Sequence, residues 1–168
     1  MRRKDREITE QSEIQSIIAK ADVCRISLVD DGKPYIVTLN FGYKPGNPAV
    51  IYFHCANEGR KLDIIEKNNN ACFEMDVDHE LISAKKACGF TMNFKSIVGF
   101  GRIYKVNDVK EKIEGLNFIM KQYSDVTGNT YAEKMLKMTT ILKSEIDELN
   151  AKQTATNKNK LNKHRQKQ

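Results

Sequence analysis

Apolar and polar residues alternate on both sides of a turn signal near the start of this chain, and this pattern limits the possible folds. Between Val23 and Phe41, apolar and polar side chains alternate with a period of two, which is the period of a half-buried β-strand. The residues from Asp30 to Lys33 interrupt the alternation, and Asp-Gly between two strand patterns favours a tight hairpin turn. Because a turn this short can join only antiparallel neighbours, the sequence predicts an antiparallel sheet.

Strand-like segments recur along the rest of the chain. They comprise residues 49–55, 72–77 and 88–106. Gly99 and Gly101 interrupt the last segment, which is compatible with one bent strand or with two strands. Residues 140–149 fit either a helix or a strand, and residues 78–86 are expected to form a polar loop.

Short helices are expected between these strands. Their apolar residues recur at helical spacing in residues 9–20, 59–67, 109–123 and about 130–138. Strands joined by short turns favour an antiparallel barrel or sandwich, so we expect a mainly β domain with inserted helices over residues 1–150. The sequence contains neither the dinucleotide-binding nor the P-loop glycine motif.

The net charge of +6 comes from the C-terminal end of the sequence. Six of the 28 basic residues and none of the 22 acidic residues lie in residues 151–168, so the rest of the chain is electrically balanced. A segment rich in Lys, Asn, Gln and Thr buries too little apolar surface to order itself, so 151–168 is expected to be a disordered basic tail. This balance disfavours nucleic-acid binding by the domain, and an RNA- or lipid-binding tail is the alternative.

Two further patterns concern the compartment. No stretch approaches the roughly 20 apolar residues of a membrane helix, and no apolar run follows the charged N-terminal residues. The four cysteines are 31, 17 and 16 residues apart, which does not match zinc-ribbon or thioredoxin-type spacing and fits a reducing compartment. We therefore expect a cytoplasmic protein with no membrane partner and no metal site.

The strongest chemical signal is Gly59-Arg60-Lys61, which lies between a predicted strand and a predicted helix. The free N–H groups and the positive dipole end of a helix start favour a bound anion. Arg60 can hold a phosphate with two donors, Lys61 adds a compact charge, and Gly59 allows close approach of the backbone. The pattern predicts a phosphate site, with two merely exposed basic residues as the alternative.

Other polar positions are less distinctive on their own. His54 stands on an apolar strand, where a half-buried imidazole without a chemical role is the simpler interpretation. Cys55 points to the opposite face of that strand, so the two residues do not form a catalytic pair. Ser96 precedes the glycine interruption of its strand. The aromatic residues expected to share a core face there are Phe90, Phe94 and Phe100.

Four segments together resemble a known family. They are residues 25–28 (RISL), 38–43 (TLNFGY), 53–61 (FHCANEGRK) and 93–101 (NFKSIVGFG). In order and spacing they resemble the FMN-binding split-barrel proteins related to pyridoxamine 5′-phosphate oxidase, and within them the nitroimidazole-resistance proteins. The resemblance covers about residues 1–150. It implies a six-stranded antiparallel Greek-key split barrel that forms a two-fold homodimer, with FMN at the subunit interface.

The resemblance also implies a site. Arg60 and Lys61, with Gly59, are expected to hold the FMN phosphate. The residues expected along the isoalloxazine ring are Thr38, Leu39 and Asn40. His54 matches the histidine near the flavin in nitroimidazole-resistance proteins, and Ser96 matches a polar position on a strand that enters the same site.

The implied function is that of an FMN-dependent oxidoreductase. Electrons from a reduced donor would pass through FMN to a small acceptor, with nitroaromatic compounds as one class, and His54 would orient the substrate or donate a proton. A flavin- or haem-binding protein of the same fold that catalyses no turnover is the alternative.

Overall fold

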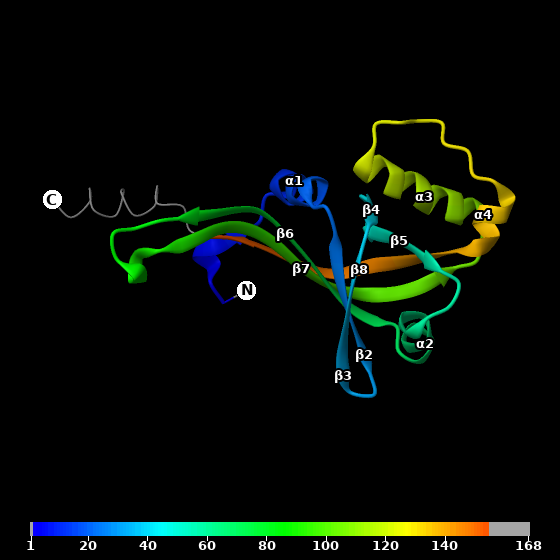
Figure 1. Cartoon of the computed structure of the whole chain (residues 1–168), viewed down its shortest axis with the longest axis horizontal. Helices are drawn as coiled ribbons and strands as arrows, with labels where there is room; N and C mark the ends of the chain where they lie inside the picture. Colours follow the sequence, from blue (N-terminus) through cyan, green and yellow to red (C-terminus); the bar gives the residue numbers. More distant parts are fainter. Residues whose placement is uncertain (1, 155–168) are drawn as a thin grey trace. The chain divides into compact units, whose positions relative to one another are not determined.

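The computed structural model describes residues 2–154, and its elements are drawn in Figure 1. The described chain divides into two compact units. Residues 2–20, 76–97 and 150–154 form the first unit, and residues 21–75 and 98–149 form the second. Every predicted site residue except Ser96 belongs to the second unit.

Antiparallel β-sheet dominates the structure. The strands within residues 2–154 are β1 (Glu7–Ile8), β2 (Cys24–Asp30), β3 (Lys33–Leu39), β4 (Phe41–Lys44), β5 (Val50–Ala56), β6 (Asn70–Ile82), β7 (Thr91–Val106) and β8 (Thr139–Gln153). Their hydrogen-bonded order is β3-β2-β6-β7-β8-β5-β4, with β1 added to β8. The path ends at β3 and β4 without closing, which is the pattern of a split barrel, so the predicted mainly β fold class is confirmed.

The eight-stranded sheet has two strands more than the resemblance implied. One is β1, whose two residues pair with Lys152 and Ala151 near the end of β8. The other arises because β3 and β4 have different partners. The ladder with β2 ends at Leu39, whereas the ladder with β5 begins at Phe41. Asn40 is the point at which the chain leaves one partner strand for another.

The predicted hairpin consists of β2 and β3, which pair from Cys24 opposite Leu39 to Asp30 opposite Lys33. Asp31 and Gly32 in the turn have φ angles of 48° and 79°. A two-residue hairpin turn whose twist matches that of the strands requires this left-handed geometry. Asp and Gly adopt it more readily than bulky residues do, so the local sequence determines the turn.

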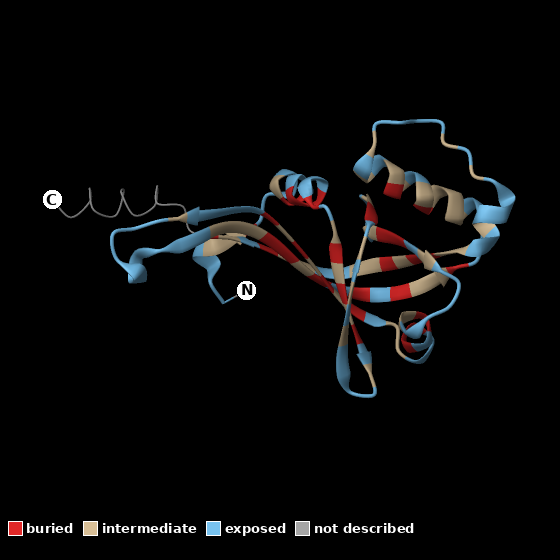
Figure 2. Cartoon of the chain, viewed as in Figure 1, coloured by how far each residue is buried: buried red, intermediate tan, exposed pale blue. Residues whose placement is uncertain are grey.

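Helix α2 (Arg60–Lys67) packs against β2 in the second unit. Figure 2 shows buried residues on one side of this helix and exposed residues on the other. The buried side chains are Leu62, Ile64 and Ile65. The predicted helix over 59–67 is therefore confirmed, and its apolar face fixes the direction in which Arg60 and Lys61 leave the first turn.

Helix α3 (Val109–Tyr123) packs against β4 and β5 (Figure 1). Gly115 and Ile119 are its buried residues, and they lie over the buried ring of Tyr52. The predicted apolar stripe from Val109 to Tyr123 is too long, because these two end residues are 57% and 43% exposed. The middle of the helix is therefore its most buried part, and at its end the Tyr123 hydroxyl accepts a hydrogen bond from the N–H of Phe41 in β4 at 3.0 Å.

Strand β7 is one continuous strand, which resolves the alternatives left open by its glycines. The ring of Phe73 occupies the place that a side chain at position 99 would need, and the backbone oxygen of Glu145 occupies that place at position 101. Gly99 and Gly101 therefore mark close packing of neighbouring groups on the strand and do not mark its end.

The ambiguous segment 140–149 is strand, as part of β8. Its register with β5 runs from Val50 opposite Glu145 to Ala56 opposite Thr139. Ile141 is 1% exposed in the core beneath α3. An available partner strand outweighs the helical spacing of this segment, because β preference depends on such neighbours. The preceding helix, α4 (Glu133–Met138), starts later than the predicted 130–138.

The first unit contains α1 (Gln11–Lys20), whose buried residues are Ile14, Ile17 and Ile18. Two ion pairs hold this helix within the unit, Lys95 to Glu13 at 2.8 Å and Lys20 to Asp78 at 3.1 Å. The predicted loop 78–86 is wrong in part, because β6 continues to Ile82. Polar side chains suit this part of the strand, since residues 78–81 are exposed.

Two further sequence predictions need correction. Phe90 and Phe100 are 47% and 46% exposed, and Lys152 covers Phe94, so these aromatics do not form a core face. Cys88 lies in the exposed 3₁₀ turn η2 (Ala87–Gly89), away from the strand that the sequence favoured. A turn replaces the start of the expected strand, which begins at Thr91.

The C-terminal part of β8 moves the predicted boundary of the basic tail. The strand continues to Gln153, and Ala151 is 2% exposed and pairs with Ile8. Residues 151–153 are therefore strand, because a partner strand compensates for their polar composition. The predicted tail from 155 to 168 lies outside the described residues. No helix within residues 2–154 combines the length and apolar character needed to cross a membrane.

Candidate functional site

The predicted phosphate site lies at the start of α2. Gly59 precedes the helix with a φ of 133°, a conformation that favours glycine. The carbonyl of Gly59 accepts the first helical hydrogen bond from the N–H of Leu62 at 2.8 Å. The N–H groups of Arg60 and Lys61 come earlier in the helix, where no intrahelical acceptor exists. An added Cβ at Gly59 would meet no atom within 4 Å, so the space beside this residue is open.

Arg60 is held in place by two residues of the β2–β3 hairpin. Its Nη2 and Nε lie 2.8 and 2.9 Å from Oδ2 of Asp30. Its guanidinium carbon lies 4.8 Å from the centre of the Tyr35 ring, which is the geometry of a cation–π contact. The Arg60 side chain remains 61% exposed, whereas that of Asp30 is 18% exposed. The hairpin therefore orients a guanidinium that still presents free N–H groups to solvent.

The charge of Lys61 acts on Cys55 of β5. Burial raises the pKa of the Cys55 thiol, and the positive charges of Lys61 and Lys105 partly oppose this effect. Lys105 pairs with Glu66, but Lys61 has no ion-pair partner among residues 2–154. A half-buried ammonium without a carboxylate partner is available to an anionic ligand.

The predicted ring-binding segment and His54 lie beside the end of the β4–β5 ladder. The ladder between β4 and β5 ends at Phe41 opposite Phe53. Asn40 and His54 each lie one residue beyond this pair, so the register places their backbones side by side. Asn40 is exposed and its amide lies 3.5 Å from the carbonyl oxygen of Asp22.

Thr38 and Leu39 lie on opposite faces of β3. Thr38 is opposite Arg25 and is exposed, whereas Leu39 is half-buried on the Tyr35 side. Because β3 ends the strand order, one of its backbone edges has no partner strand in the described chain. Backbone N–H and C=O groups are available along this edge.

His54 is an exposed residue on β5, and its imidazole has no hydrogen-bond partner in the described chain. It faces away from Cys55, as the sequence predicted from strand alternation. Its side of β5 borders a cavity of about 340 Å³ between α3 and α4. The sequence alone favoured a half-buried imidazole, whereas the structure has an exposed imidazole at this position.

Ser96 belongs to the first unit and is 5% exposed. Its hydroxyl oxygen is buried and has no hydrogen-bond partner within residues 2–154. An orphaned hydroxyl is unusual, since buried polar groups normally find a partner. The predicted contact of Ser96 with a cofactor stays a prediction.

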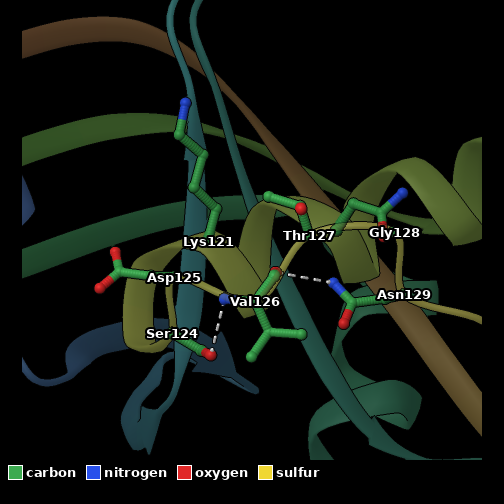
Figure 3. Close-up of a pocket in the computed structure, with 8 residues that line it drawn as sticks. Lys121, Ser124, Asp125, Val126, Thr127, Gly128 and Asn129 are labelled. Atoms are coloured by element: carbon green, nitrogen blue, oxygen red, sulfur yellow. Dashed lines mark hydrogen bonds between the residues drawn. The ribbon is translucent and has the colours of Figure 1, made fainter.

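A larger hollow of about 570 Å³ lies beside the C-terminal half of α3 and the loop after it, and none of the predicted residues lines it (Figure 3). The backbone N–H of Val126 donates to the Ser124 hydroxyl at 3.1 Å, and the Asn129 amide donates to the Val126 carbonyl at 3.4 Å. These bonds shape the loop itself. Within the described ranges, no group of three or more His, Cys, Asp or Glu is arranged to hold a metal ion.

Sequence reasoning missed three residues that shape the site. Asp30 was part of the hairpin signal, and Tyr35 was one of several alternating residues, so neither stood out as a partner of Arg60. Tyr131 lines the cavity beside His54 and donates to Oδ1 of Asn117 at 2.9 Å. An aromatic residue just before a helix gave the only signal for it.

Comparison with known proteins identifies the family. Residues 10–153 match the family model described as pyridoxamine 5′-phosphate oxidase. The chain belongs to the pyridoxamine 5′-phosphate oxidase family. Comparison with curated protein sequences gives no match.

Solved structures of this fold family include several similar chains. A candidate 5-nitroimidazole antibiotic resistance protein from Bacteroides thetaiotaomicron is 29% identical, with a TM-score of 0.77, and the match covers 88% of this chain and 86% of that one. The flavocytochrome Anf3 from Azotobacter vinelandii is 20% identical, with a TM-score of 0.72 over 87% and 68% of the two chains. A protein from Mycobacterium smegmatis that binds FAD and haem is 15% identical, with a TM-score of 0.75 over 88% and 72%. The last two similarities establish the fold.

Proposed function

We propose that this chain binds FMN and acts as an oxidoreductase that passes electrons from a reduced donor to a small oxidised acceptor. The observation that carries the proposal is the Gly59-Arg60-Lys61 turn, in which two cations and two free backbone N–H groups meet at an open helix start. FMN carries a phosphate dianion at one end, and such an anion is favoured at this turn.

The clamp residues fit a phosphate. Two of the five N–H donors of Arg60 point to Asp30, which leaves three for a second acceptor. Lys61 adds a charge without a carboxylate partner in the described chain. The carboxylate of Asp30 would repel an incoming phosphate. Asp30 therefore orients Arg60 but weakens the attraction of this turn for an anion.

The ring end of the cofactor would lie at the junction of β3 and β4. The free edge of β3 can bond the polar rim of a flavin, and Leu39 and Asn40 continue this edge toward His54. Thr38 can contribute its hydroxyl from the exposed face. Bound FMN supplies electron transfer between a reduced donor, such as a reduced nicotinamide, and the acceptor.

The side chains of the protein would orient the electron donor and the acceptor and would supply a proton to the acceptor. The donor loses a hydride, and the acceptor gains two electrons and two protons, one of which His54 can deliver from its imidazole. His54 can do so because its ring is exposed and unpartnered in the described chain. Similarity to the Bacteroides resistance protein supports nitroaromatic compounds as one class of acceptor.

We also propose that two chains form a homodimer with FMN at the subunit interface. Ile36 is 65% exposed and Val29 is 44% exposed, and the hairpin register puts both on the outer face of β2 and β3. Thr38 shares that face. Exposed apolar side chains beside a predicted cofactor residue are what a partner subunit would cover.

An absorption spectrum of the purified protein tests the cofactor. Flavin bands, and release of FMN on denaturation, are expected. The double variant Arg60→Ala, Lys61→Ala should weaken FMN binding by at least about 100-fold, since each cation contributes a charge-assisted bond. Lys67→Ala, at the other end of the same helix, serves as the matched control. Unchanged affinity in the double variant would exclude the clamp.

The oligomer is tested by light scattering during gel filtration. Ile36→Glu should give a monomer with reduced FMN content, because a charge is placed in the proposed interface. Leu81→Glu changes a comparably exposed apolar residue, at 61%, and should leave the dimer intact. A monomer in the unmodified protein contradicts this part of the proposal.

A flavin- or haem-binding protein without turnover is the second candidate. The unpartnered imidazole of His54 favours it, because neutral imidazole is a common haem ligand. Two structurally similar proteins, the flavocytochrome and the Mycobacterium smegmatis protein, are described as haem-containing. A haem spectrum that disappears in His54→Ala, with no reductant-driven turnover, would favour this candidate.

A further inference from the structure

The cavity beside His54 has a composition that differs from that of the phosphate clamp. Its apolar lining consists of Leu116, Ile119, Met120, Ala132, Met135 and Leu136. The polar residues around it are His54, Thr130, Tyr131 and Thr139. No carboxylate or ammonium is among the residues that line it. At about 340 Å³, its volume falls near the lower end of the roughly 300–1,000 Å³ typical of small-molecule sites.

The core beneath α3 continues into this cavity. Tyr52, Ile119 and Ile141 pack together on the α3 side of the sheet. His54 is two residues beyond Tyr52 and therefore on the same face of β5, where it is paired with Ile141. The buried core under α3 therefore ends at the His54 imidazole, and the cavity lies next to this side chain.

The polar groups of the cavity are placed to recognise one end of a molecule. The imidazole of His54 is free to bond, since no described residue accepts from it or donates to it. The Tyr131 hydroxyl donates to Asn117, which leaves its oxygen as an acceptor only. Burial raises the pKa of Tyr131, so the phenol stays neutral. The cavity thus offers apolar walls, one donor-capable imidazole and no charged side chain other than a protonated His54.

We propose that this cavity between α3, α4 and His54 is the binding site of the oxidised acceptor, an uncharged and mostly apolar small molecule whose one hydrogen-bond-accepting group contacts His54. The role of the ligand as electron acceptor rests on the proposed function. The existence of a binding site is inferred from the cavity alone. A charged acceptor is disfavoured because none of the residues that line the cavity carries a permanent charge, so a charged ligand would lose water with at most the His54 imidazole to compensate.

Tryptophan fluorescence can test binding directly, because the chain contains no tryptophan. Met135→Trp places a reporter at a lining position that is 57% exposed. Lys134→Trp places one on the same helix at an exposed position outside the lining. Nitrobenzene, a neutral nitroarene that quenches indole on contact, is the probe, and the proteins are used as purified.

Saturable quenching is expected in Met135→Trp and only linear, collisional quenching in Lys134→Trp. Adding His54→Leu to Met135→Trp should weaken nitrobenzene binding by about two- to tenfold, the contribution of one hydrogen bond. The anion 4-nitrobenzoate should bind at least about tenfold more weakly than nitrobenzene. Linear quenching in both reporters overturns the site, and equal binding of the anion overturns the ligand class.

A kinetic measurement links the cavity to turnover. Leu136→Trp should raise the KM for a nitroarene acceptor by at least about tenfold, because the indole fills the cavity, while FMN affinity stays unchanged. Lys134→Trp should leave both unchanged. An unaltered KM in Leu136→Trp shows that the acceptor binds elsewhere. A protein that takes up no FMN refutes the proposed function, yet the quenching experiment still decides whether the cavity binds its ligand.

Discussion

The guanidinium of Arg60 lies 2.8 Å from a carboxylate oxygen of Asp30, although β3, β4 and β5 lie between the two residues in the sequence. Asp30 is the less exposed partner, with 18% of its side chain accessible against 61% for Arg60. The pair therefore places a fixed anion behind a cation that faces outward. This arrangement orients Arg60 and at the same time reduces its attraction for a second anion.

The first prediction separates these two effects. Asp30→Asn keeps an oxygen acceptor for Arg60 but removes the negative charge, so FMN affinity should rise by up to about tenfold. Asp30→Ala also removes the acceptor and should give less of this gain, because Arg60 is no longer held. Isothermal titration with FMN measures both. Weaker binding in Asp30→Asn would contradict the proposed opposition between Asp30 and the phosphate.

The second prediction concerns the backbone at the helix start. Gly59→Ala should lower the free energy of unfolding by about 1–3 kcal/mol, because a φ of 133° is strained for any residue with a Cβ. No atom lies within 4 Å of the added methyl group, so the loss is conformational and not steric. Urea unfolding measures it. Gly32→Ala, at a φ of 79° with equally open surroundings, provides a comparison in which a left-handed residue costs about 1 kcal/mol.

The third prediction tests the packing of β7. Gly99→Ala should destabilise the protein by about 1–3 kcal/mol, since the methyl group would overlap the ring of Phe73, which is 2% exposed. Phe73→Leu in the same chain should recover part of this loss, giving a coupling of about 0.5–3 kcal/mol in a double-mutant cycle. Gly101→Ala should not be rescued in this way, because the obstructing atom is the backbone oxygen of Glu145. Additive effects at Gly99 and Phe73 would contradict the contact.

The fourth prediction is a pH dependence. Burial, helped by the nearby carboxylates of Glu114 and Glu111, raises the pKa of Tyr52 from 10.0 to about 12. The folded state therefore holds this proton more tightly than the unfolded state. The resulting stability is complete below the unfolded pKa and is lost as the pH rises from about 10 toward about 12.

Urea unfolding across this alkaline range provides the measurement. Tyr52→Phe should show a smaller fall in unfolding free energy between about pH 10 and about pH 12 than the unmodified protein, since phenylalanine does not titrate. Tyr104→Phe, the same substitution at a half-buried position, is the control. Equal falls in both variants would show that another group causes the alkaline loss.

Local sequence was sufficient where a pattern had one physical solution. The Asp31-Gly32 turn, the alternation of β2 and β3, and the helix start after Gly59 are all present, because backbone geometry and strand period leave little choice. The same reasoning failed where the outcome depended on a distant partner. Residues 140–149 are strand because β5 pairs with them, and Phe100 is exposed although its spacing fits a core face.

For the candidate site, residue types and spacing were enough to predict a glycine followed by two cations at a helix start, and a histidine on the opposite side of β5 from Cys55. The contacts that these residues make come from the fold. Asp30 and Tyr35 reach Arg60 because the hairpin folds against α2, and His54 borders a cavity because α3 and α4 end the apolar layer beside it. The chemistry of each side chain follows from the residue itself. Contacts between distant segments depend on how the whole sheet pairs and on which faces the helices bury.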